Sequence, residues 1–90
     1  MRDSKAKLIG FSPKIKRMKP WKEPVDVDKY QSDEQQFIKV YLTNHDMEHD
    51  HFIIDNGFIA LGDEVYQIVD VTYDLKRPKY ANCLVSKIAV

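Results

Sequence analysis

The chain has 90 residues, of which 43% are hydrophobic and 31% charged, and its formal net charge is zero. This composition predicts one folded domain rather than a disordered chain, and a chain of this length buries only about 60–65% of its unfolded surface. A complete enzyme with its own cofactor domain is therefore disfavoured. A binding module, a subunit or an inhibitor-like protein is favoured.

The charges are distributed unevenly along the chain. Residues 1–22 carry eight bases and one acid, residues 23–75 carry 13 acids and two bases, and residues 76–90 carry four bases and no acid. A basic segment of this kind can bind a nucleic acid, an acidic protein partner, or the acidic body of its own chain or of a sister subunit. The sequence leaves these three interpretations open, and contact with its own or a sister chain is favoured.

Residues 1–24 are predicted to form an extended basic arm in front of a single β-rich domain at residues 25–90. Three prolines disfavour a long helix in the arm, although a short strand fits residues 5–11. Apolar side chains alternate with lysines along the rest of the arm, and Trp21 is the largest of them. Trp21 either packs against the domain or presents an exposed ring to a partner.

The start of the domain contains an ambiguous segment. Residues 25–29 alternate apolar and charged side chains and fit a short strand or a loop. Residues 32–43 begin with Ser-Asp-Glu-Gln, which matches the capping box of a helix. The following Phe-Ile-Lys-Val-Tyr-Leu-Thr is rich in strand-forming residues and alternates apolar and polar positions. We favour a strand, and the helix remains the alternative.

Residues 52–90 are predicted to form an antiparallel meander of about four strands. Asn56-Gly57 and Gly62-Asp63 are signals for tight turns, because such turns need residues that tolerate a positive φ. The segment at 65–73 is expected to be the longest strand, and residues 80–90 the last one. The predicted fold is mainly β, with α+β as the alternative. It is a small antiparallel barrel or rolled sheet of five to seven strands.

The segment from Gly62 onward carries a family resemblance. Its sequence Gly-Asp-Glu-Val-Tyr-Gln-Ile-Val-Asp-Val, followed by a charged turn and a strand, resembles the small barrel proteins that join heads and tails in tailed phages. It is also similar to SH3-like and oligonucleotide-binding barrels. The resemblance covers the last third of the chain, and it implies a small barrel that serves as a structural or joining component of a virion.

No catalytic or metal site is predicted. His45, His49 and His51 lie in one acidic segment, but zinc sites need three or four ligands with a supporting shell, and no distant Cys or His completes the set. We expect a solvated loop there, with no metal or other cofactor. Cys83 is expected to be buried in a strand. The chain contains no nucleophile elbow and no phosphate-binding glycine loop, so no enzymatic activity is expected.

The sequence predicts a non-catalytic protein-interaction or assembly module, in which the basic arm docks on an acidic surface of a partner or sister subunit. The alternative is a nucleic-acid-binding module that uses the arm together with the turn at 76–79. No apolar segment is long enough for a secretory signal or a membrane span, so a cytoplasmic protein, or a virion component assembled in the cytoplasm, is expected, without a membrane partner. The predicted contact residues are Lys14, Lys16, Arg17, Lys19, Trp21, Lys22, Tyr73, Lys76, Arg77, Lys79 and Tyr80.

Overall fold

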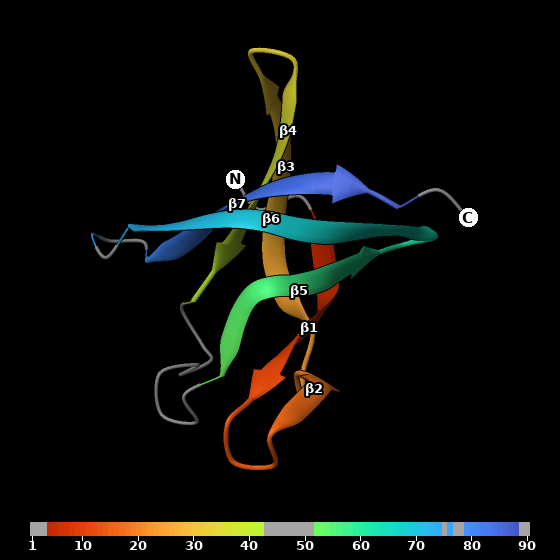
Figure 1. Cartoon of the computed structure of the whole chain (residues 1–90). Coiled ribbons are helices and arrows are strands. Elements are labelled where there is room, and N and C mark those ends of the chain that lie inside the picture. Colours follow the sequence, from red (N-terminus) through yellow and green to blue (C-terminus); the bar gives the residue numbers. More distant parts are fainter. Residues whose placement is uncertain (1–3, 43–51, 75, 77–78, 89–90) are drawn as a thin grey trace.

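Segments that alternate apolar and polar residues form seven β-strands in a computed structural model of the chain (Figure 1). The structure describes residues 4–42, 52–74, 76 and 79–88, and among these no residue is helical and no helix that could cross a membrane is found. In chain order the strands are β1 (Ser4–Ser12), β2 (Arg17–Pro20), β3 (Val25–Ser32), β4 (Gln35–Tyr41), β5 (Ile53–Leu61), β6 (Glu64–Asp74) and β7 (Tyr80–Lys87).

Six of these strands close an antiparallel barrel. The ring runs from β1 through β3, β4, β7, β6 and β5 and returns to β1. It therefore consists of two three-stranded meanders, β1-β3-β4 and β5-β6-β7, joined at both edges. The seventh strand, β2, lies outside the ring and pairs with the later residues of β1, where β3 no longer does. The predicted small barrel of five to seven strands is confirmed, and the ambiguous segment at 32–43 contains strand β4.

The core fills the interior of this barrel with alternate residues of every ring strand. Cys83 is fully buried, as expected, and burial raises the pKa of its thiol to about 12. The thiol is therefore protonated at neutral pH. The largest fully buried side chains are those of Tyr66, Leu8, Ile38, Ile54, Ile59, Ile68, Val25, Val27 and Val40.

The prediction of a turn at Asn56-Gly57 is wrong, because both residues lie inside β5. Asn56 takes a left-handed φ of 63°, and the register between β1 and β5 shifts beside it. Gly57 is packed so closely on β1 that a Cβ atom there would lie 2.2 Å from the carbonyl oxygen of Ile9. The two residues bend one long strand instead of separating two, so the described part of residues 52–90 contains three strands and not four.

The β5–β6 and β3–β4 hairpin turns use different chemistry. Gly62-Asp63 connects β5 to β6 as predicted, with Gly62 at a φ of 62°. The residues that matched a capping box instead form the β3–β4 hairpin, because Ser32 pairs with Gln35 across the turn. Its two central residues, Asp33 and Glu34, have φ values of 51° and 65°. This is the positive-φ pair of a type I′ turn, which Asn-Gly more commonly supplies.

A bulge in β6 changes which side chains face the core. A single regular strand would place residues 65, 67, 69, 71 and 73 on one face. The register against β7 shifts between Ile68 and Asp70, and the extra residue, Val69, is 56% exposed. Beyond the bulge Val71 packs against the core. The long strand is confirmed, whereas its uniform alternation is not.

Residues 4–24 do not form a separate arm. β1 is a strand of the ring, because Ala6, Leu8, Gly10 and Ser12 alternate inward and are all buried. The chain then returns along β1 as β2 before it enters β3. Residues 1–3 lie outside the described part of the chain. The basic residues of this segment are therefore carried by the β1–β2 hairpin and by its connection to β3 rather than by a free leader.

Candidate protein-interaction surface

The β1–β2 hairpin carries four of the eight basic residues that were predicted to contact a partner. We call residues 13–19 the basic hairpin; its turn protrudes at one end of the molecule (Figure 1). Lys14, Lys16 and Arg17 are exposed there, and Lys19 is half-buried. Lys16 has a φ of 58° and donates its backbone N–H to the carbonyl oxygen of Ser12 at 2.7 Å. This backbone hydrogen bond holds the turn in shape, and the turn therefore presents several positive charges on one short protrusion.

Exposed apolar side chains lie among and beside these cations. Ile15 in the turn is 45% exposed, Met18 on β2 is 41% exposed and Ile53 on β5 is 43% exposed. Strand pairing places Met18 and Ile53 on either side of Phe11 on β1. Single exposed apolar residues are common on protein surfaces, but a contiguous row of them is typical of a contact site. We call this surface the apolar patch, formed by Ile9, Phe11, Met18, Ile53 and Phe58.

Trp21 does not belong to the exposed surface. Its side chain is only 8% exposed, and its ring centroid lies 4.7 Å from that of Phe52 at an interplanar angle of 43°. The backbone N–H of Trp21 donates to the carbonyl oxygen of Leu8 at 2.7 Å. Of the two interpretations that the sequence left open, packing against the domain is the one that fits. The neighbouring Lys22 is exposed.

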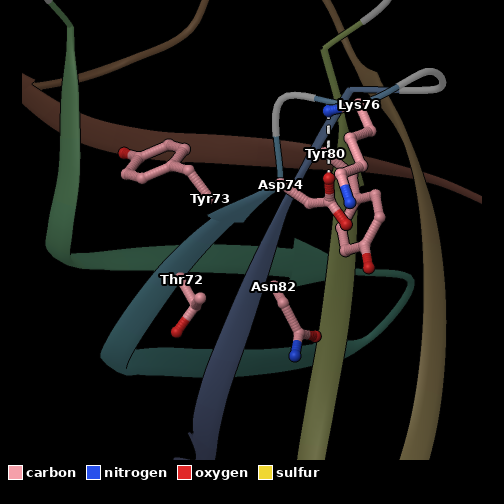
Figure 2. A pocket seen from close by; sticks show the side chains of 6 residues that line it. All are labelled: Thr72, Tyr73, Asp74, Lys76, Tyr80 and Asn82. Carbon is pink, nitrogen blue, oxygen red and sulfur yellow. Dashed lines mark hydrogen bonds between the residues drawn. The ribbon is translucent and has the colours of Figure 1, made fainter.

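The second predicted set of contact residues lies elsewhere, at the β6–β7 turn (Figure 1). Lys76 and Lys79 are exposed, and Asp74 Oδ1 accepts the backbone N–H of Lys76 at 3.0 Å. Figure 2 shows the ring of Tyr73 pointing away from the ring of Tyr80, so the two tyrosines do not form a pair. Arg77 lies outside the described residues. An open depression here is lined by Thr72, Tyr73, Asp74, Lys76, Tyr80 and Asn82 (Figure 2).

A row of aromatic rings on the outer face of β3, β4 and β7 was not predicted. Lys39 Nζ lies 5.3 Å from the ring centroid of Tyr30 and 5.0 Å from that of Tyr80. Tyr30 also stacks on Phe37 at 5.2 Å and donates its hydroxyl hydrogen to Asn82 Oδ1 at 2.8 Å. Lys39 and Phe37 thus already cover parts of these rings. The pairing of Tyr30 with Phe37 follows once the turn is placed at residues 33–34, within the segment whose sequence also matched a helix cap.

A polar network closes the end of the barrel where β6 begins and β7 ends. The buried Tyr66 donates its hydroxyl hydrogen to Glu64 Oε1 at 3.0 Å, and Lys29 Nζ lies 3.6 Å from the same oxygen. Lys87 forms an ion pair with Glu64 Oε2. Hydrogen bonds from Lys87 and then from Tyr66 lower the pKa of Glu64 to about 2. The hydrogen bond to Glu64 raises the pKa of Lys87, and the hydrogen bond to Tyr66 raises that of Lys29.

The depressed pKa of Glu64 makes a prediction about acid stability. A carboxylate whose pKa is lower in the folded chain stabilises the fold above its unfolded pKa of about 4.5, and this contribution is lost as the pH falls toward about 2. We expect Glu64→Gln, which keeps an oxygen acceptor for Tyr66, to lower the melting temperature at neutral pH. The difference from wild type should shrink between pH 4.5 and about 2. Thermal melts at several pH values measure it, and a difference that does not change with pH would contradict the role of the charge.

The histidine cluster stays a prediction. His45, His49 and His51 lie outside the described residues, so the expected solvated loop is untested. Within the described ranges, no group of three or more His, Cys, Asp or Glu side chains is placed to hold a metal ion.

Comparison with known proteins assigns no family and no function to this chain. No family model matches the sequence, and neither the curated proteins nor the solved structures give a significant match. The resemblance of the last third to phage joining proteins therefore remains a prediction. The fold and the surface chemistry described above carry the functional interpretation by themselves.

Proposed function

We propose that this protein is a non-catalytic interaction or assembly module that docks through its basic hairpin on an acidic surface of a protein partner or sister subunit. The observation that carries the proposal is that exposed apolar and basic side chains share one protrusion. Ile15 lies between Lys14 and Lys16, and Met18 follows Arg17. Apolar contact supplies affinity, while the cations select an acidic partner and accelerate docking.

The charges of the hairpin also favour an external partner. Within the described residues, the ion pairs use Lys5, Lys29 and Lys87, and none of them uses a cation of the basic hairpin. These cations are solvated in the isolated chain and are available to a partner. A protein partner is favoured over a nucleic acid, because phosphates offer nothing for the aliphatic side chains of Ile15, Met18 and Ile53 to bury.

A binding experiment with three sets of variants tests the proposal. Tagged wild type is used to capture partners from an extract of the source cells, and the captured protein is then purified and titrated. We expect K14E/K16E/R17E and I15S/M18S each to weaken the purified complex at least about tenfold, which corresponds to about 1.4 kcal/mol. The control K76E/K79E changes the charge of a different surface and should bind like wild type. Equal binding by all four proteins would contradict the proposal.

The same variants also test the alternative that the protein binds a nucleic acid. That alternative requires the basic hairpin and the turn at 76–79 to act together, yet these two sets lie apart on the barrel (Figure 1). A random-sequence single-stranded oligonucleotide is the probe. Binding that falls steeply with salt and is weakened by both K14E/K16E/R17E and K76E/K79E would favour the alternative. Truncation of residues 1–24 is unsuitable here, because it removes β1 from the ring.

A further inference from the structure

The basic hairpin has a counterpart of opposite charge at the other end of the same molecule. The β3–β4 hairpin protrudes at the top of Figure 1, whereas the basic hairpin protrudes at the bottom. The turn of the β3–β4 hairpin presents Asp33 and Glu34, which are both exposed. No described ion pair uses either carboxylate. The barrel therefore has a basic end and an acidic end, each on a projecting hairpin.

These two ends cannot neutralise each other within one chain. The Cα positions extend over 36 Å and 34 Å along the two longer axes, and the hairpins point in opposite directions (Figure 1). Exposed charges further apart than about 10 Å are largely screened at 0.1 M salt. Attraction between the ends therefore requires a second copy. The zero net charge of the chain means that no overall repulsion opposes the approach of such a copy.

The acidic end also carries apolar side chains. On the outer face of the β3–β4 hairpin, the stacked rings of Tyr30 and Phe37 lie behind the turn and are half-buried. Ile15 and Met18 occupy the corresponding place beside the cations of the basic hairpin. Each end thus combines projecting charges with apolar side chains close behind them. The two surfaces therefore have opposite charges, and both present apolar side chains that a contact could bury.

We infer that the acidic surface met by the basic hairpin is the β3–β4 turn of a second copy of this chain. The inference rests on the proposed function and names the partner. Because the two contact surfaces are different and lie at opposite ends, the contact is heterologous. A docked pair leaves one basic and one acidic end free. Successive copies therefore build a ring if the rotation closes, or an open filament if it does not.

Light scattering and sedimentation of the full chain test this arrangement. At low salt and sub-millimolar concentration, the wild type should show a mass that rises with concentration well above 10.6 kDa, and it should return to that mass at high salt. K14E/K16E/R17E and D33K/E34K reverse one end each, and each alone should stay monomeric. An equimolar mixture of the two should associate again, because the first retains its acidic end and the second retains its basic end.

Folding is controlled with a third variant. D33N/E34G removes the acidic charge and places Asn-Gly, the favoured pair, at the two positive-φ positions, so it should fold at least as well as wild type. It should nevertheless remain monomeric. A wild type that stays at 10.6 kDa, or variants that associate as the wild type does, would overturn the inference. A monomeric wild type that still binds a purified acidic partner through the basic hairpin would leave the proposed function standing without it.

Discussion

Replacement of Gly57 by alanine should lower the free energy of unfolding by about 3 kcal/mol or more, because the new methyl group meets backbone on two sides. An ideal Cβ at this position would lie 2.2 Å from the carbonyl oxygen of Ile9 and 2.9 Å from that of Ile54. Neither oxygen belongs to a flexible side chain, so β1 and β5 must separate where they close the ring. In an ordinary strand the same substitution stabilises by about 0.5–1 kcal/mol, so the expected sign is reversed.

Thermal and urea unfolding followed by circular dichroism measure this effect. For a domain of this length, 1 kcal/mol corresponds to about 4–8 °C in melting temperature, so a fall of more than about 12 °C is expected. Gly62→Ala is the matched control, because no atom lies within 4 Å of its Cβ and only its φ of 62° opposes alanine. That conformation costs about 1–2 kcal/mol. Equal losses in the two variants would show that backbone crowding at the β1–β5 seam is not decisive.

The behaviour of Gly57 also explains where sequence reasoning succeeded and where it failed. Asn-Gly was interpreted through local chemistry alone, and that chemistry is real, since Asn56 does take a positive φ. The local sequence does not show which strand pairs with this segment. β5 remains paired to β1 on both sides of the bend, so the same dihedral angle bends a strand instead of reversing it. The bulge at Val69 was not predicted for the same reason, because it arises from the register of β6 against β7.

The candidate site was predicted in part for a related reason. The cations of the basic hairpin could be identified from composition, and Lys14, Lys16 and Arg17 among them are exposed. A short strand at residues 5–11 was anticipated, but its place in the ring was not, because that place depends on pairing with β3 and β5, which come later in the chain. The apolar patch draws Ile53 from β5 and Met18 from β2, residues that meet only across the intervening β1. Proximity of this kind is a property of the closed ring.

Trp21→Ala should be the most destabilising truncation within the predicted contact set, with a loss of about 3–5 kcal/mol. The ring is nearly buried and packs on Phe52 at 4.7 Å, so its removal leaves a cavity in the core beside Phe52. Small domains are stable by only about 5–15 kcal/mol, so a substantial unfolded population is expected near physiological temperature. Denaturant unfolding followed by circular dichroism measures the loss.

Trp21→Phe separates a core role from a contact role. It keeps a ring against Phe52 and should lose only about 1–2 kcal/mol, while it leaves the basic hairpin unchanged. If Trp21 acts through the core, this variant binds the purified partner with wild-type affinity once it is folded. An exposed contact residue would behave in the opposite way, with nearly unchanged stability and weakened binding. Because the chain has one tryptophan, the fluorescence of the wild type supplies an independent readout, and its emission should shift to longer wavelength only on unfolding.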